Sequence, residues 1–272
     1  MCKHNSFLWL TLQKPWGLLI LTLMVQAVLL DLDGVLYVGN QVINGAAQAV
    51  QRLHDAGIKV AGVTNTTTQA KHTIAQKLQK LGIPLDEQHL FTPASLVKAY
   101  IGNNTARLYI RDDLRTDLQV TQSNTKPDYI VMGDIGGLGY PPQVLHEIFL
   151  HLMQGADLLA LHKNRFWQKE DGLHLDLGTW VAALEYASGK QAKVFGKPSQ
   201  DFFLHICRQL NISPAQALMV GDDIESDILG AQQAGLQAAL VQTGKYNADF
   251  VQQTGVQPDI LLQSIHQLNI EG

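Results

Sequence analysis

The chain has 272 residues, of which 46% are hydrophobic and 16% are charged, and its formal net charge is −4. This composition is typical of a globular protein and contains no long stretch with a disordered character. A negative charge without any lysine and arginine cluster argues against a nucleic-acid partner, because phosphate backbones are bound by basic surfaces. The two cysteines, Cys2 and Cys207, form neither a disulfide framework nor a metal-spaced pair. We therefore expect a reducing, cytoplasmic location.

Residues 1–23 are set apart as an N-terminal extension. A basic start at Lys3 precedes apolar residues that Lys14 and Pro15 interrupt. Three interpretations stay open: translation starts naturally at Met24, the segment anchors a cytoplasmic protein, or it is a secretory signal without a clear cleavage site. The first is favoured, because the apolar run from Trp16 is too short for a bilayer unless it takes in the first core strand. We therefore do not expect a membrane partner.

From residue 27 onward, short apolar runs alternate with amphipathic helical patterns. The predicted strands cover residues 27–30, 59–63, 107–110, 128–132, 158–161, 193–195, 217–220 and 238–241. The predicted helices cover residues 46–56, 69–81, 142–154, 202–210 and 227–234. Glycines stand where four of these helices should end, at Gly57, Gly82, Gly155 and Gly235. This alternation predicts βαβ units, and hence an α/β fold with a doubly wound, Rossmann-like parallel sheet.

Polar residues follow four of the predicted strands at the point where each strand ends. These stretches are Asp31-Leu32-Asp33-Gly34, Thr64-Asn65, Gly196-Lys197-Pro198 and Gly221-Asp222-Asp223. Doubly wound folds bind their ligands outside the carboxyl ends of the strands. We therefore expect the functional side chains of this protein among these residues.

Asp31 and Asp33 are the first candidate pair. Two neighbouring carboxyl groups cannot both ionise cheaply, so one tends to stay anionic while the other holds a proton. That division suits a nucleophile and a general acid. The alternative is a pair of solvated acids in a turn after the strand.

Thr64 and Lys197 are candidates for holding an anion. A hydroxyl group and backbone N–H groups at the start of a helix bind phosphate, and a lysine offsets its charge. The alternatives are ordinary helix capping by a threonine at positions 66–68 and a surface lysine in a turn.

Asp222, Asp223 and Asp227 lead into a predicted helix. Mg²⁺ prefers oxygen ligands, usually one or two carboxylates with water and substrate phosphate. Acids also stabilise helix N-termini for local reasons. The occurrence of all four stretches at strand ends favours the functional interpretation.

These stretches resemble the four motifs of the haloacid dehalogenase (HAD)-like hydrolase superfamily, in the same order. Asp31-Leu32-Asp33-Gly34-Val35-Leu36-Tyr37 resembles the nucleophile motif, Thr64-Asn65 the second, Lys197 the third, and the run from Gly221 to Asp227 the fourth. The resemblance covers roughly residues 25 to 245. No motif position departs from the pattern, so the resemblance implies an active enzyme.

The spacing of the motifs resembles subfamily IIA, the NagD-like phosphatases. About 30 residues separate Asp33 from Thr64, whereas about 130 separate Thr64 from Lys197, which leaves room for an inserted α/β domain. The resemblance implies a HAD core domain at residues 24–95 and 184–272 and a C2-type cap domain at residues 96–183. A homodimer is common among such proteins and stays open here.

The resemblance also implies the role of each residue. Asp31, the backbone carbonyl of Asp33, and Asp222 would hold Mg²⁺, while Thr64, Asn65 and Lys197 would contact the phosphate of the substrate. Asp223 and Asp227 would support the site. Asp31 would attack phosphorus and form an aspartyl-phosphate, with Asp33 as general acid and base. The implied function is a Mg²⁺-dependent phosphatase for a small phosphorylated substrate, whose identity the sequence does not give.

Two alternatives remain for this set of residues. The chain could be a catalytically silent protein that binds phosphorylated ligands on the same fold, since fold alone does not prove turnover. It could also be a phosphoacceptor switch, against which the motif order and the long insertion argue. The acidic turns Arg111-Asp112-Asp113 and Gly133-Asp134 imitate parts of the motifs, and we interpret both as structural. His162 is a candidate for the cap side of the site, or a residue of a solvated loop.

Overall fold

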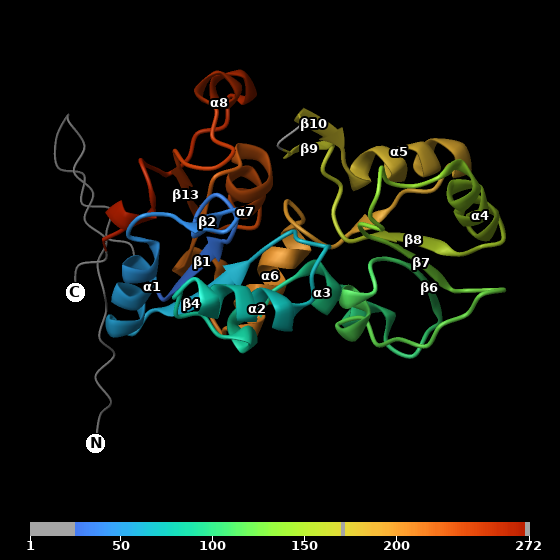
Figure 1. Cartoon of the computed structure of the whole chain (residues 1–272), viewed down its shortest axis with the longest axis horizontal. Coiled ribbons are helices and arrows are strands. Elements are labelled where there is room, and N and C mark those ends of the chain that lie inside the picture. Colours follow the sequence, from blue (N-terminus) through green and yellow to red (C-terminus); the bar gives the residue numbers. More distant parts are fainter. Residues whose placement is uncertain (1–24, 170–171, 270–272) are drawn as a thin grey trace. The chain divides into compact units, whose positions relative to one another are not determined.

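The computed structural model describes residues 25–169 and 172–269, and the predicted N-terminal extension lies outside these ranges (Figure 1). The chain divides into two compact units. The first comprises the residues up to Thr64, Ala75–Phe91 and the residues from Phe203 onward, and the second comprises Asn65–Ile74 and Thr92–Phe202. The domain ranges given above, 24–95 with 184–272 and 96–183, stay a prediction.

The first unit is built on a six-stranded sheet in the order β14-β13-β12-β1-β4-β5. All of its pairings are parallel. The strands are β1 (Ala27–Asp31), β4 (Lys59–Val63), β5 (Leu90–Phe91), β12 (Ala217–Gly221), β13 (Gln237–Val241) and β14 (Ile260–Leu262). Every residue of β1 and β12 is buried, as expected for central strands that are covered on both faces.

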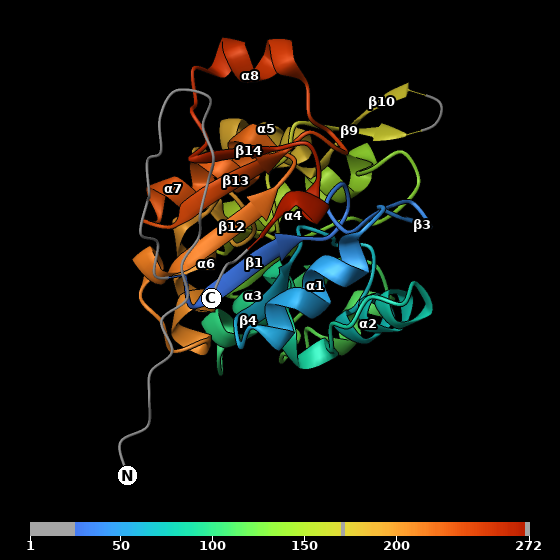
Figure 2. The ribbon, with the colours of Figure 1, turned by 90° about the vertical axis from the view of Figure 1, so that its left-hand side faces the viewer.

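Helices lie on both faces of this sheet. Helix α1 (Ala46–Asp55) lies on one face, and α6 (Gln200–Gln209) and α7 (Gly230–Gln233) lie on the other (Figures 1 and 2). The buried residues of α1 are Ala46, Ala49, Val50 and Leu53. This spacing of three and four residues forms the apolar stripe with which α1 packs against the sheet. Helices α2 (Lys71–Lys80) and α8 (Ala248–Thr254) and the two-stranded hairpin of β2 (Tyr37–Val38) and β3 (Gln41–Val42) complete the main elements.

The second unit has its own parallel sheet in the order β11-β8-β7-β6. Its strands are β6 (Ala106–Tyr109), β7 (Tyr129–Met132), β8 (Asp157–Ala160) and β11 (Lys193–Val194). Its helices are α3 (Pro93–Ile101), α4 (Pro142–Met153) and α5 (Leu177–Ser188), and an antiparallel hairpin is formed by β9 (Phe166–Lys169) and β10 (Gly172–Leu175). Side chains from α4, α5 and the sheet share one buried apolar cluster, which includes Ile130, Ile148 and Val181.

The observed architecture confirms the predicted fold class. All eight predicted strands are present, with ends that agree to within one residue. The helix predicted at residues 227–234 differs in form: the chain turns as a π-helix, η4 (Ile224–Leu229), before the short α7. Several elements were not predicted, namely α3, α5, α8 and the strands β2, β3, β5, β9, β10 and β14.

None of the helices in the described ranges is both long enough and apolar enough to cross a membrane.

Candidate active site

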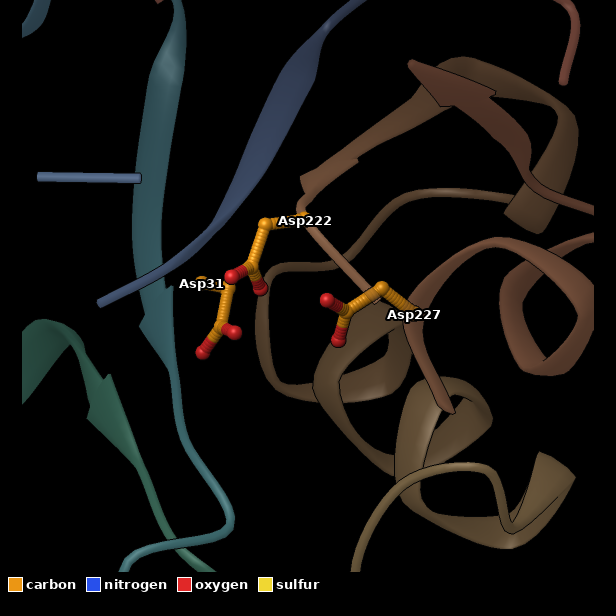
Figure 3. A group of neighbouring side chains, drawn as sticks. All are labelled: Asp31, Asp222 and Asp227. Carbon is orange, nitrogen blue, oxygen red and sulfur yellow. The ribbon is translucent and has the colours of Figure 1, made fainter. Parts of the chain in front are cut away.

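Three buried carboxyl groups meet at the carboxyl ends of the central strands. Asp31 is the last residue of β1, Asp222 follows the neighbouring strand β12 directly, and Asp227 lies in η4. One ligand atom from each of the three lies within 4.8 Å of the others. Figure 3 shows the three carboxyl groups pointing toward one another. The parallel pairing of β1 with β12 creates this group, because it brings the ends of both strands to one edge of the sheet.

Backbone N–H groups fix the orientation of each carboxyl group. Oδ1 of Asp31 accepts a hydrogen bond from the Leu32 N–H at 2.8 Å. Oδ2 of Asp222 accepts one from the Lys245 N–H at 2.6 Å. Oδ2 of Asp227 accepts one from the Asp223 N–H at 3.1 Å. The carboxyl groups are therefore held in place by the main chain.

The π-helix η4 brings Asp227 back beside Asp222. Asp223 begins η4 as its N-cap, and its Oδ1 accepts hydrogen bonds from the N–H groups of Glu225 and Ser226 at 3.1 and 3.0 Å. The wider turn then passes directly over the end of β12, where a Cβ atom added to Gly221 would lie 2.3 Å from the Cβ atom of Asp227. A glycine at position 221 is thus what allows the carboxyl group of Asp227 to approach so closely.

The electrostatics of this group favour a cation. Burial, followed by the charges of Asp31 and Asp227, raises the pKa of Asp222 to about 8. Within residues 25–169 and 172–269, no hydrogen-bond partner reaches the buried Oδ1 of Asp222. A buried acceptor without a partner is expensive, and so is a cluster of like charges. A divalent cation would relieve both costs, and carboxylate oxygens are the ligands that Mg²⁺ prefers. The three residues therefore fit such an ion.

Asp33 lies beside this group in the turn that follows β1. Desolvation of its carboxyl group, and after it the charge of Asp31, raises the pKa of Asp33. The turn is closed by the Gly34 N–H, which donates to the carbonyl oxygen of Tyr37 at 2.7 Å. The ammonium group of Lys77 lies 3.9 Å from the ring centroid of Tyr37, and its charge acts against the rise in the pKa of Asp33.

The phosphate-site candidates of the sequence lie in two places. Thr64 is buried directly after β4 in the first unit, and its N–H donates to the Phe91 carbonyl at 3.1 Å. In the second unit, the Asn65 side chain is bound to the backbone of Lys197 at both ends: it accepts from the Lys197 N–H and donates to the Lys197 carbonyl, each at 2.8 Å. Lys197 is only 2% exposed. It is therefore a buried residue in a fixed backbone, and the alternative of a surface lysine is wrong.

The acidic turns that resemble parts of the motifs, together with nearby Asp117, form hydrogen bonds and an ion pair within the second unit. Oδ2 of Asp113 accepts a hydrogen bond from the Ala70 N–H at 2.8 Å, and Oδ2 of Asp117 accepts one from the Lys71 N–H at 2.9 Å, at the start of α2. Asp134 forms an ion pair with Arg111 at 2.6 Å. These residues stabilise the second unit.

His162 is buried in the second unit. Its Nε2 lies 3.8 Å from Oδ1 of Asp176, the N-cap residue of α5. The alternative of a residue in a solvated loop is therefore wrong, and a role on the cap side of the site stays a prediction.

One part of the site was not predicted from the sequence. The loop Thr243-Gly244-Lys245 follows β13 and reaches the carboxyl group of Asp222. The sequence carries no signal for this contact, because a backbone N–H makes it and every residue except proline has one.

Fold and site together define a class: a doubly wound α/β protein with a buried carboxylate group, suited to a divalent cation, at the carboxyl ends of its central strands. Two protein-family models match the chain, one described as haloacid dehalogenase-like hydrolase over residues 28–119 and one described as HAD-hydrolase-like over residues 194–268.

Relatives of known name match over most of their length. The human haloacid dehalogenase-like hydrolase domain-containing protein 2 is 35% identical over 242 residues, which cover 88% of this chain and 93% of the relative. The human phospholysine phosphohistidine inorganic pyrophosphate phosphatase is 36% identical over 241 residues, which cover 85% of this chain and 87% of that protein. The chain belongs to the haloacid dehalogenase-like hydrolase family, as its motifs predict.

Solved structures share the fold. A 4-nitrophenylphosphatase from Thermotoga maritima superposes with a TM-score of 0.84 at 20% identity, over 90% of this chain and 96% of that one. NagD from Escherichia coli K-12 superposes with a TM-score of 0.81 at 23% identity, over 90% of this chain and 98% of that one. The predicted resemblance to the NagD-like subfamily is thus confirmed at the level of the fold.

Proposed function

We propose that this HAD-type phosphohydrolase is a Mg²⁺-dependent phosphatase that acts on a small phosphorylated substrate through an aspartyl-phosphate on Asp31. The observation that carries this proposal is the buried group of Asp31, Asp222 and Asp227, whose ligand atoms lie within 4.8 Å of one another. Asp31, Asp222 and the backbone carbonyl of Asp33 would hold the ion, with Asp227 beside them. When bound, Mg²⁺ offsets the negative charge that otherwise keeps a carboxylate away from a phosphate.

The chemistry is assigned to two carboxyl groups. A carboxylate oxygen of Asp31 attacks phosphorus, so that a bond from Asp31 to phosphorus forms while the bond to the leaving oxygen breaks. Asp33 gives its proton to that leaving oxygen, and the raised pKa of Asp33 favours the protonated form that this step requires. Asp33 then takes a proton from the water that attacks the aspartyl-phosphate, which releases phosphate and restores Asp31.

Thr64, Asn65 and Lys197 are assigned to the phosphate group of the substrate. A buried lysine is a strong source of positive charge where water is scarce, and Lys197 is buried on a backbone that Asn65 holds at two points. Asn65 is thus a residue that positions Lys197. Among the relatives, one is named as a phosphatase of phospholysine, phosphohistidine and inorganic pyrophosphate, and these compounds are substrates to test first.

Phosphate release from the purified chain, with Mg²⁺ or with a chelator, tests the proposal. The panel should contain inorganic pyrophosphate, phosphohistidine, phospholysine, sugar phosphates, nucleotides and 4-nitrophenyl phosphate. We expect release that requires Mg²⁺, and a loss of about 10³-fold or more in Asp31→Asn, because that variant lacks the nucleophile. Asp249→Asn is the matched control, since Asp249 is an exposed aspartate in the first turn of α8.

Two outcomes would contradict the proposal. Turnover by Asp31→Asn at the rate of the unmodified chain would refute the nucleophile. Binding of phosphorylated ligands without Mg²⁺-dependent release would instead support the silent binding protein on the same fold.

A further inference from the structure

The loop Thr243-Gly244-Lys245 touches the acidic group through its main chain. The Lys245 N–H donates to Oδ2 of Asp222 at 2.6 Å. This bond occupies one oxygen of Asp222, and the other, Oδ1, is the buried oxygen without a hydrogen-bond partner in the described part of the chain. The loop thus decides which oxygen of Asp222 stays available.

The same loop is packed against the turn of the nucleophile motif. The hydroxyl group of Thr243 donates to the carbonyl oxygen of Gly34 at 2.5 Å. A Cβ atom added to Gly244 would lie 2.0 Å from Oδ2 of Asp222 and 2.5 Å from the Cα atom of Gly34. Gly244 also has a φ of +60°, which disfavours other residues. Three segments, the turn at Gly34, the loop and Asp222, therefore meet with no room for an additional atom.

We propose that Thr243-Gly244-Lys245 is a positioning element of the metal site: its backbone orients the carboxylate of Asp222 and holds the turn at Gly34 against it. This inference rests on the proposed function, because it assumes that Asp222 binds Mg²⁺. Residues that hydrogen-bond to metal ligands fix the ligand orientation, and their loss commonly weakens metal affinity about 10- to 100-fold.

The positive charge of the Lys245 ammonium group should also affect Mg²⁺ binding, in the opposite direction to the backbone. It lies 3.8 Å from Oδ2 of Asp223, and it feels the negative charges of Asp31, Asp222 and Asp227 as well. A positive charge at this position stabilises the acidic group while no metal is bound, and it repels an incoming cation. The backbone of the loop thus promotes Mg²⁺ binding, whereas the side chain of Lys245 opposes it.

Gly244→Ala tests the backbone contact, with Mg²⁺ binding measured by isothermal titration calorimetry on the full-length, metal-free protein. The added methyl group must displace the carboxyl group of Asp222, so we expect binding about 10- to 100-fold weaker. Gly255→Ala is the matched control, because Gly255 has a similar φ of +67° but nothing within 4 Å of its added Cβ atom. It reproduces the backbone strain alone, and we expect its Mg²⁺ affinity to equal that of the unmodified chain.

Lys245→Gln tests the side chain and keeps the N–H that binds Asp222. We expect tighter Mg²⁺ binding and a lower melting temperature in chelator, a pair of changes that a merely structural role would not give. If Gly244→Ala does not fold, Thr243→Val removes the bond to Gly34 and should weaken Mg²⁺ binding.

The possible failures are distinguishable. An unmodified chain that binds no Mg²⁺ overturns the proposed metal and this inference with it. An unmodified chain that binds Mg²⁺, together with Gly244→Ala or Thr243→Val variants that bind it equally well, overturns the inference alone. Weaker binding by Lys245→Gln overturns the assigned effect of its charge.

Discussion

The two oxygens of Asp222 have different surroundings, and this difference is the most informative detail of the site. Oδ2 accepts a hydrogen bond from the Lys245 N–H, while Oδ1 is buried and has no hydrogen-bond partner in residues 25–169 and 172–269. Burial and the charges of Asp31 and Asp227 raise the pKa of Asp222 to about 8, which favours the protonated form of this carboxyl group where a cation would bind. Proton and metal compete for such a carboxyl group, as is general for metal sites built from ionisable ligands.

Burial in the folded protein should slow the alkylation of the Cys207 thiol. It is buried in α6, and burial raises the pKa of its thiol. Alkylating reagents attack the thiolate, so a raised pKa shifts the onset of reaction to higher pH than for an exposed cysteine, whose pKa is about 8.5. We expect native Cys207 to react with iodoacetamide at pH 8 at least about 10-fold more slowly than Cys207 of the urea-unfolded chain.

Peptide mass spectrometry measures this reaction for Cys207 separately from Cys2. Equal rates for the native and the unfolded chain would show that the environment of α6 opens readily, contrary to this prediction.

At the residue level, the sequence indicated the acidic group and missed the loop beside it. Asp31, Asp222 and Asp227 carry side chains with an evident chemistry, and each stands at or just beyond the end of a strand. The contribution of Lys245 to Asp222 comes from a backbone N–H, which every residue except proline has. No residue type marks such a contact, so only coordinates show it. The roles assigned to Asp33, Thr64 and Lys197 stay predictions.

Among the elements, η4 is where the fold and the site are most closely linked. The sequence predicts a helix at residues 227–234, but the turn begins at Ile224 with the wider geometry of a π-helix. Short π-helical segments are often found at functional sites. A segment of six residues is too short for its hydrophobic pattern to distinguish a π-helix from an α-helix. The sequence prediction therefore placed the start of the helix too late.

The start of α2 depends on side chains from a distant segment. Asp113, in the short helix η2 (Asp113–Thr116), accepts from the Ala70 N–H, where the sequence suggested capping by a local threonine. We expect Asp113→Ala to lower the free energy of unfolding by about 1 kcal/mol, as for other lost helix caps. The neighbouring Asp112→Ala should change it little, because Asp112 is 99% exposed and contacts Arg115 at the surface.

Urea unfolding of both variants measures this difference. Equal losses for Asp112→Ala and Asp113→Ala would show that the cap is not the cause.

Helices with a clear amphipathic period and strands with a continuous apolar run were predicted, whereas most of the other elements lack such a pattern. Strands of two or three residues, such as β5 and β14, are too short to show an alternation. Helix α5 is apolar along most of its length, Leu177–Ser188, so it lacks the polar face that marks an amphipathic helix. The pairing of β11 with β8 depends on contacts far apart in sequence, which a local pattern does not contain.

For the whole molecule, the fold class followed from the alternation of strands and helices, because a parallel connection requires a crossover. The division of the chain into two units could not be predicted from this alternation. Both units contain residues of α2 and of α6, since the unit boundaries fall at Ile74 and at Phe202. A unit boundary that falls inside a helix is marked in the sequence by neither a change of composition nor a linker.

The two units give a prediction for how Mg²⁺ stabilises the chain. Asp31, Asp222 and Asp227 all lie in the first unit, and a ligand stabilises the part of a protein that must be folded to bind it. At a Mg²⁺ concentration 100 times its Kd, the stabilisation is about 2.7 kcal/mol. This corresponds to a slowing of amide exchange by about 100-fold at sites where exchange requires that unit to open.

Hydrogen exchange followed by mass spectrometry should show this slowing in peptides from β1 and β12, and much less in peptides from β6, β7 and β8. Asp222→Asn, which lacks a ligand, should show no slowing in either set. Equal slowing in both sets would mean that the two units open together as one cooperative structure.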